Sequence, residues 1–106
     1  MEVRHYVSAA GNDLYQSWVD GLRDRQGRIA VVRQVLRLEE GSLGDHRFLR
    51  DGVSELRIDA GPGYRVYFAR EGAVVVVLLC GGDKGTQDRD IERAVECWRD
   101  YQRRQA

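Results

Sequence analysis

The chain has 106 residues, enough for one compact domain with a single core and too few for two ordinary domains. Hydrophobic residues make up 42% and charged residues 32%, a balance typical of a soluble globular protein and not of a disordered chain. Seventeen basic residues, sixteen of them arginine, balance seventeen acidic ones. This zero net charge excludes a nucleic-acid binder that relies on a bulk positive field, so any such binding requires a local cluster of cations.

The cysteines and histidines are too few and too scattered for a metal centre. Cys80 and Cys97 are isolated thiols that support neither a disulfide framework nor a zinc site. His5 and His46 are the only imidazoles, so we expect no metal and no cofactor. The longest apolar run, residues 73–80, is too short to span a bilayer, and residues at the N-terminus form no apolar signal segment. We therefore expect a cytoplasmic protein with no membrane partner.

The N-terminal half predicts one short strand and two helices. Residues 3–7 form a strand, and Asn12 is well placed as the N-cap of the helix that follows. Over residues 13–24 apolar residues recur every three to four positions, which indicates one helical face. Residues 28–40 predict a second helix that ends at Gly41 as a C′ glycine. Its wide apolar stripe comprises Ile29, Val31, Val32, Val35, Leu36 and Leu38. We expect the two helices to form an antiparallel hairpin.

The C-terminal half predicts three strands and a last helix. Residues 41–52, with four charges and three glycines, are predicted to be an exposed connection. The strands are predicted over residues 53–59, 64–70 and 73–80. The first two alternate polar and apolar residues, whereas the third is uniformly apolar, which is typical of a central strand covered on both faces. A helix capped by Thr86 follows. The order β-α-α-β-β-β-α predicts an α+β domain with a mainly antiparallel four-stranded sheet.

Two arginines are predicted to share one face of this sheet. A hairpin that aligns the apolar residues of the first two strands puts Arg57 and Arg65 side by side. Planar guanidinium groups grip two phosphate oxygens and stay charged, so this pair suits the stabilisation of phosphate charge. Tyr67 shares the face, where its ring is placed to stack on a nucleic-acid base. The alternative is a solvated ion-pair network of the two arginines with Glu55 and Asp59.

Lys84 lies in a glycine-rich loop, residues 81–86, between the apolar strand and the last helix. Backbone N–H groups and the helix dipole favour an anion at such a place, so Lys84 is a candidate phosphate ligand. The loop is not a nucleotide-binding P-loop, because the Gly-x-x-x-x-Gly-Lys-Ser/Thr spacing is absent. The alternative is an ordinary strand-to-helix turn. Asp83 beside Lys84 is either a proton acceptor or, as we expect, the charge partner of Lys84.

Four short segments in the second half of the chain carry a family resemblance. They read Ser54-Glu55-Leu56-Arg57-Ile58, Gly63-Tyr64-Arg65-Val66-Tyr67-Phe68, Leu78-Leu79-Cys80-Gly81-Gly82-Asp83-Lys84 and Asp90-Ile91-Glu92-Arg93-Ala94. Together and in this order they resemble the RelE/ParE toxin superfamily, in particular its HigB-like group of addiction module killer proteins. The resemblance implies a RelE-like fold that covers residues 1–106 as a single domain, with an N-terminal helical hairpin and a C-terminal helix.

The resemblance implies the toxin of a type II toxin–antitoxin system. The resemblance further implies a ribosome-dependent mRNA endoribonuclease, or mRNA interferase, that inhibits translation without a metal. Its implied partners are the ribosome, mRNA and a cognate helix-turn-helix antitoxin, with operator DNA reached only through the antitoxin complex. In RNA-cleaving relatives the arginine of the Gly-Tyr-Arg strand stabilises phosphate charge and matches Arg65, a basic residue after the last strand matches Lys84, and Arg57 sits where relatives often carry a cation. We expect these three residues to be catalytic and, with Tyr67, to bind RNA.

One departure from the family pattern leaves other functions open. Some relatives place a catalytic tyrosine early in the last helix, where this chain has Asp88-Arg89-Asp90-Ile91, and no general base is identified. One alternative is a non-nuclease, ParE-like inhibitor of DNA gyrase, which agrees with the zero net charge. Another is an inactive relative that still binds its antitoxin.

Overall fold

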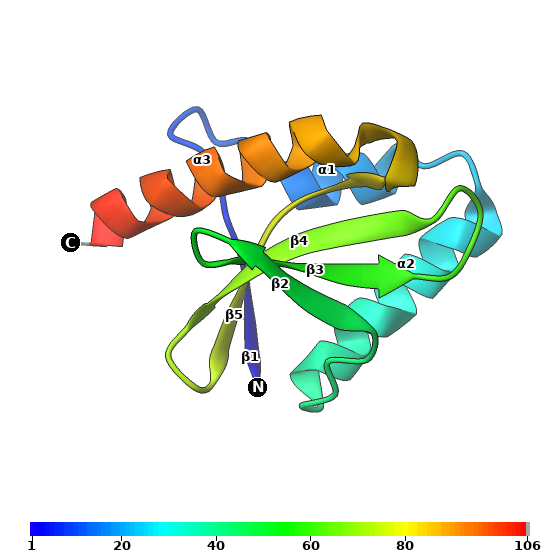
Figure 1. Ribbon diagram of the computed structural model, residues 1–106, viewed down its shortest axis with the longest axis horizontal. Coiled ribbons are helices and arrows are strands. Elements are labelled where there is room, and N and C mark those ends of the chain that lie inside the picture. Colours follow the sequence, from blue (N-terminus) through cyan, green and yellow to red (C-terminus); the bar gives the residue numbers. More distant parts are fainter. Residues whose placement is uncertain (106) are drawn as a thin grey trace.

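A five-stranded mixed sheet organises the chain in the computed structural model, which describes residues 1–105 (Figure 1). The strands are β1 (Glu2–His5), β2 (His46–Arg50), β3 (Val53–Ile58), β4 (Tyr64–Glu71) and β5 (Val75–Asp83). They lie in the order β1-β5-β4-β3-β2, with β1 parallel to β5 and all other neighbours antiparallel. The predicted α+β class is confirmed, but the sheet has five strands instead of four.

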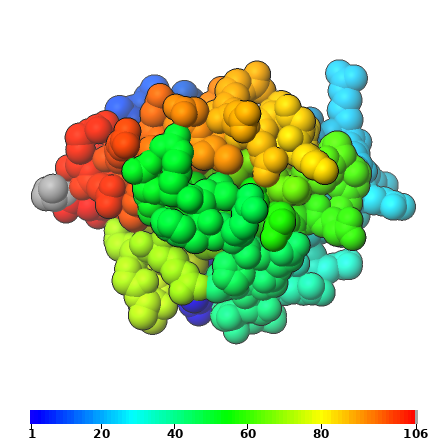
Figure 2. Space-filling model, in the orientation of Figure 1, coloured from blue at the N-terminus to red at the C-terminus, as the bar shows by residue number. Residues whose placement is uncertain are grey.

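The additional strand is β2, within the segment that the sequence predicts to be a connection. That prediction was wrong because β2 lies at the sheet edge, where side chains face solvent and no apolar alternation is needed. A tight turn at Asp51 and Gly52, both with positive φ, joins it to β3. Figure 2 shows that β2 and its neighbours form much of the surface between α3 and the end of α2. The strand brings Arg47 opposite Glu55.

Three helices cover the two faces of the sheet (Figure 1). They are α1 (Leu14–Asp20), α2 (Arg25–Glu39) and α3 (Gln87–Gln105), and a 3-10 turn, η1 (Lys84–Thr86), precedes α3. The cap of α1 is Asp13, whose carboxylate accepts from the Gln16 N–H, so the predicted cap, Asn12, was wrong by one residue. Asp24 caps α2 in the same way, through the N–H of Gly27, and α2 therefore starts three residues earlier than predicted. Within residues 1–105 no helix is long and apolar enough to cross a membrane.

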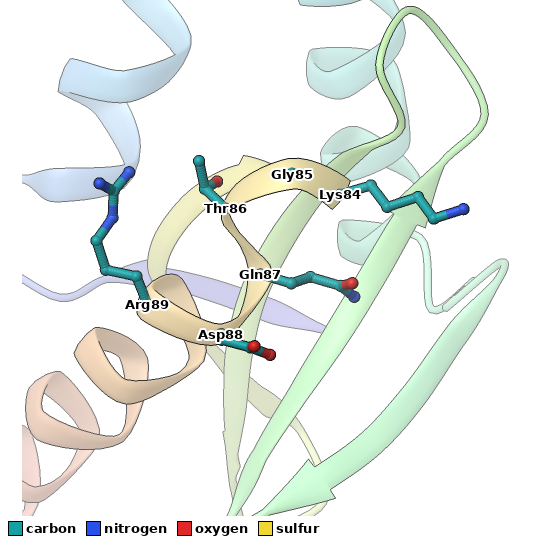
Figure 3. A pocket seen from close by; sticks show the side chains of 6 residues that line it. All are labelled: Lys84, Gly85, Thr86, Gln87, Asp88 and Arg89. Atoms are coloured by element: carbon teal, nitrogen blue, oxygen red, sulfur yellow. The ribbon is translucent and has the colours of Figure 1, made fainter.

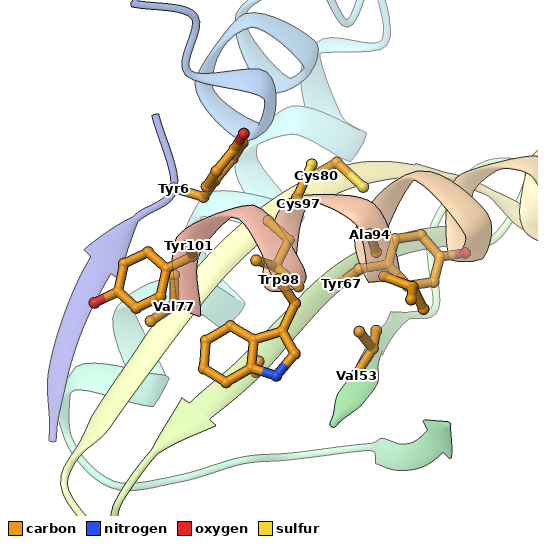
Figure 4. Packing of buried hydrophobic residues seen from close by; sticks show 12 residues of the cluster. Tyr6, Val53, Tyr67, Val77, Cys80, Ala94, Cys97, Trp98 and Tyr101 are labelled. Atoms are coloured by element: carbon orange, nitrogen blue, oxygen red, sulfur yellow. The ribbon is translucent and has the colours of Figure 1, made fainter. Parts of the chain in front are cut away.

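Buried side chains form one layer on each face of the sheet. The layer under α1 and α2 consists of Tyr15, Val19, Val31, Val35, Leu38, Leu56, Ile58, Tyr64, Val66, Phe68, Val76 and Leu78. The layer under α3 consists of Tyr6, Val53, Tyr67, Ala69, Val77, Leu79, Cys80, Ala94, Val95, Cys97, Trp98 and Tyr101 (Figure 4). Residues 75–79 of β5 alternate between the two layers, which confirms the prediction of a central strand buried on both faces. At a register shift Cys80 follows Leu79 into the layer under α3.

The predicted apolar stripe of α2 divides into a buried and an exposed part. Val31, Val35 and Leu38 pack on the sheet. Ile29, Val32 and Leu36 lie on the outer side of the helix and remain exposed. The stripe is therefore wider than the surface that the sheet can cover.

Candidate functional site

The antiparallel register of β3 and β4 pairs Arg57 directly with Arg65. Both side chains leave the sheet on the face that carries α3, so the predicted common face is confirmed. Their exposed fractions differ, at 36% for the Arg57 side chain and 12% for Arg65. Because like charges that lie opposite each other destabilise a strand pair, a nearby anion has to offset the repulsion.

That anion is Glu55, whose side chain is fully buried on the same face. Its carboxylate oxygens lie 4.0 Å from Arg57 Nε and 3.6 Å from Arg65 Nε. On the edge strand β2, Arg47 Nη2 approaches the carboxylate to 3.4 Å. From α3, Gln87 Nε2 donates a hydrogen bond of 3.0 Å to Oε2. A buried carboxylate is tolerated when cations and donors surround it, and here four elements supply them.

The arginine network differs from the solvated one that the sequence left as an alternative. The ion pairs with Glu55 exist, but their carboxylate is buried rather than solvated. Asp59 forms no ion pair with any of residues 1–105, and Asp45 takes its place, 3.2 Å from Arg57 Nη2. The network therefore orders the arginines as part of the fold.

This cluster keeps hydrogen-bonding capacity that the fold leaves unused. Four buried atoms have no hydrogen-bond partner among the described residues: Glu55 Oε1, Arg57 Nε, Arg65 Nε and Tyr67 Oη. The two Nε–carboxylate distances exceed the usual 2.7–3.2 Å of a hydrogen bond. Since buried polar atoms normally find partners, their concentration in one place marks a site rather than ordinary packing.

Arg57, Arg65 and Lys84 line one open pocket of about 480 Å³. The rest of the wall consists of Asp45, Ile58, Asp59, Gly61, Pro62 and Gly63. The Lys84 N–H donates to Gly63 O at 3.0 Å, which ties η1 to the β3–β4 turn. Arg65 Nη1 donates to the same carbonyl at 3.0 Å. The structure thus brings together the three cations that the sequence predicts to act on one phosphate.

The β3–β4 turn that frames this pocket is anchored to the start of α2. Tyr64 Oη donates to Asp24 Oδ2 at 3.0 Å, and the Gly27 N–H donates to Asp24 Oδ1 at 3.0 Å. The bond from the Gly27 N–H is the larger cause, and together the two bonds hold the pKa of Asp24 below its usual value. The turn itself needs glycine at Gly61 and Gly63, which have positive φ angles of 52° and 83°. The β3–β4 turn is therefore held in place by the start of α2 and by η1.

The start of α3 forms a second hollow, of about 430 Å³, beside Lys84 (Figure 3). Lys84 and Gln87 extend toward the strands in this view, whereas Arg89 extends to the opposite side. Asp83 is the N-cap of η1 and accepts from the Gly85 N–H at 2.8 Å. Neither Asp83 nor any other carboxylate of residues 1–105 forms an ion pair with Lys84. The expected charge partnership with Asp83 is therefore wrong, and the ammonium group remains open for an anion.

The prediction that Tyr67 stacks on a base was wrong, and both imidazoles lie away from the arginine pocket. Tyr67 lies on the arginine face but is fully buried under α3, and burial raises the pKa of its hydroxyl. Its ring has no free face for a base, because strand alternation identifies a face and not the helix that covers it. His46 pairs with Leu56 on the opposite face, and His5 lies 2.7 Å from Asp13. Neither imidazole lines the arginine pocket.

Sequence patterns missed two residues that shape the site. Arg47 lies in the segment that was predicted to be a connection, so its position opposite Glu55 could not be inferred. Gln87 carries no pattern that links it to Glu55, 32 residues away. A signal did exist for Glu55 itself, because an acidic residue two positions before Arg57 on a strand lies on the same face.

Comparison with known proteins places the chain in a family. Residues 17–98 match the family model described as Phage derived protein Gp49-like (DUF891). The chain belongs to this Gp49-like family. The Gp49-like match includes Arg57, Arg65 and Lys84, and the family is associated with toxin-like proteins and with toxin–antitoxin systems, which implies an antitoxin partner. A Haemophilus influenzae protein described as "Uncharacterized protein" is 45% identical over 80 residues, which are 76% of this chain and 81% of that protein.

Proposed function

We propose that this Gp49-like chain is the toxin of a type II toxin–antitoxin pair and cleaves mRNA on the ribosome, as its resemblance to HigB-like members of the RelE/ParE superfamily implies. One observation carries the proposal: Arg57, Arg65 and Lys84 come from separate elements and converge on one open pocket. Localised cations of this kind bind phosphate even when the net charge is zero.

Metal-free RNA cleavage makes specific demands on such a pocket. A 2′-hydroxyl oxygen loses its proton and forms a bond to the adjacent phosphorus, and negative charge accumulates on the two non-bridging oxygens. The bond from phosphorus to the 5′ oxygen breaks, and that oxygen takes up a proton from solvent water. Arg57 and Arg65 present forked donors side by side, which suits two oxygens, and Lys84 adds a point charge beside them. A preorganised donor to such oxygens contributes about 100-fold to 1,000-fold in rate.

The proton of the 2′-hydroxyl needs an acceptor, and we assign it to Asp59. Asp45 and Asp59 are the carboxylates in the pocket wall. Asp45 is paired with Arg57, whereas Asp59 is exposed and has no ion pair within residues 1–105. Glu55 cannot take this role because its carboxylate is buried behind the arginines.

The test measures growth and transcript cleavage after induction of the chain. We expect Lys84→Ala and Arg65→Ala to lower cleavage about 100-fold, and Asp59→Asn to slow it as well. Lys84 is exposed and unpaired within residues 1–105, so its loss leaves the fold intact. Arg70→Ala is the matched control, because Arg70 is an exposed arginine of β4 outside the pocket. Primer extension maps the cleaved transcripts.

Three results would contradict the proposal. Undiminished cleavage by Lys84→Ala and Arg65→Ala would remove these residues from the mechanism. Growth arrest with intact transcripts and inhibited DNA supercoiling would establish the gyrase alternative. Induction without growth arrest would establish an inactive relative.

A further inference from the structure

The outer side of α2 carries a row of exposed aliphatic side chains. Ile29, Val32 and Leu36, which we call the α2 stripe, lie three and four residues apart and are 46%, 41% and 53% exposed. Together with Arg28 and Arg33 they line a shallow hollow of about 350 Å³. Single exposed apolar residues are common on protein surfaces, but a contiguous row in a hollow marks an interaction site.

Arginines without carboxylate partners flank the α2 stripe. Residues 25–38 contain four arginines and no acidic residue. The four are Arg25, Arg28, Arg33 and Arg37, and none forms an ion pair within residues 1–105. Elsewhere on the chain eight arginines have a carboxylate within 4.0 Å, namely Arg4, Arg47, Arg50, Arg57, Arg65, Arg99, Arg103 and Arg104. At 100° per residue, Arg28 lies on one side of the stripe and Arg33 and Arg37 lie on the other, so the rim is positive on both sides.

We propose that the α2 stripe docks an acidic amphipathic helix of a partner protein, and that this partner is the antitoxin. The identity of the partner rests on the proposed function, whereas the chemistry of the segment follows from the surface. Apolar residues of the segment cover the α2 stripe, and its carboxylates meet the arginine rim. Opposite charges across the rim steer the encounter and fix the register.

The arginine rim and the aliphatic hollow disfavour two other occupants of the α2 stripe, a second copy of the chain and single-stranded nucleic acid. In a symmetric dimer formed through this face, each α2 stripe would meet its copy and bring Arg28, Arg33 and Arg37 against the same arginines. Single-stranded nucleic acid is held by aromatic stacking as well as by cations, and the hollow between the arginines is lined by aliphatic side chains without a π face.

The α2 face continues into the candidate active site. Arg33 and Arg37 also line a pocket of about 370 Å³ whose other wall includes Arg57 and Asp59. A segment that is docked on the α2 stripe and continues past Arg33 therefore reaches Arg57 through this shared pocket. Docking at this place both holds the antitoxin and blocks the pocket.

The test uses the protein encoded by the reading frame adjacent to this gene, co-expressed with the tagged chain. Val32→Glu introduces a carboxylate into the centre of the α2 stripe, and Val74→Glu is the matched control, since Val74 is an exposed valine before β5. We expect Val32→Glu to weaken binding at least 100-fold in calorimetry and Val74→Glu to leave it unchanged. Arg33→Glu should weaken binding less at high salt than at low salt, because the rim contacts are screened.

The outcomes separate this inference from the proposed function. Binding by Val32→Glu equal to that of the control, or no binding of the adjacent protein by the natural chain, overturns the docking surface. Loss of affinity for a single-stranded RNA oligonucleotide in Val32→Glu, with protein binding retained, shows that the face binds RNA instead. If the chain cleaves no RNA but Val32→Glu still loses the partner, the docking surface stands and the proposed function fails.

Discussion

Glu55→Gln removes the negative charge that Arg57 and Arg65 share. The substitution keeps the shape of a fully buried side chain, and its amide oxygen can still accept from Gln87. What disappears is the negative charge 3.6 Å from Arg65 and 4.0 Å from Arg57. The two arginines, paired across β3 and β4, then repel each other, and only the exposed Asp45, 3.2 Å from Arg57 Nη2, remains to offset the repulsion.

The expected loss of stability follows from the burial of the partners. Breaking a buried ion pair by removing one partner costs about 3–5 kcal/mol. Arg65 is nearly buried and carries most of this cost, whereas Arg47 and Arg57 are partly exposed and therefore screened by solvent. We expect the lower end, about 3 kcal/mol. At about 4 °C per kcal/mol for a domain of this size, the Tm falls by about 12 °C.

Thermal and urea denaturation followed by circular dichroism measure this change. The matched control is Glu92→Gln, which removes the charge of an exposed carboxylate paired with Arg50 and should change the free energy of unfolding by less than about 0.5 kcal/mol. In a double-mutant cycle, Glu55→Gln combined with Arg65→Gln should cost less than the sum of the single changes, because each removes the same interaction. A Glu55→Gln protein as stable as the Glu92→Gln control would refute the role of Glu55 as the anchor.

One substitution and two measurements on the natural chain test the packing. Gly81→Ala places a Cβ 2.1 Å from Trp18 Cε3, and the clash should cost about 1–3 kcal/mol, seen as a lower Tm; an unchanged Tm contradicts it. Burial raises the pKa of Cys97 to about 11, so at pH 8 about one thiol in a thousand is ionised, and the native chain should react with Ellman's reagent far more slowly than the urea-unfolded chain. Burial also raises the pKa of Tyr6 and Tyr15 to about 12. Since raised values favour the neutral phenols, stability should be full below pH 10 and fall toward pH 12, and a flat Tm profile would exclude this.

Patterns of period two and 3.6 in the sequence were enough to predict most of the elements. They identified β3, β4, β5 and all three helices, because these elements each bury one face or both. They could not identify β2, which pairs through its backbone and exposes most of its side chains. Capping residues were predicted less well, since Asn12 and Asp13 are both good caps and only the fold decides between them.

The site was predictable where it depends on strand alternation and unpredictable where it depends on tertiary packing. The common face of Arg57 and Arg65 follows from the pleat of two paired strands. The burial of Tyr67 depends on α3, which crosses that face from a distant part of the chain (Figure 4). The role of Glu55 depends on strand alternation and on tertiary packing. Alternation places it on the face of the two arginines, while β2 supplies a further cation, Arg47, and α3 supplies a hydrogen-bond donor, Gln87.

The zero net charge of the chain says little about what each of its surfaces binds, and the distribution of charges in the structure gives the reason. Charges separated by more than about 8 Å in physiological salt act almost independently, so the surface works as separate local fields. Three exposed acidic residues of α3, Asp88, Glu92 and Glu96, contribute to the net charge without lining the pocket. Within residues 1–105 Lys84 of the pocket and the arginines beside the α2 stripe have no carboxylate partner and are available for anions. Whether a surface attracts an anion therefore depends on the charged groups within about 8 Å of its cations, and not on the net charge of the whole chain.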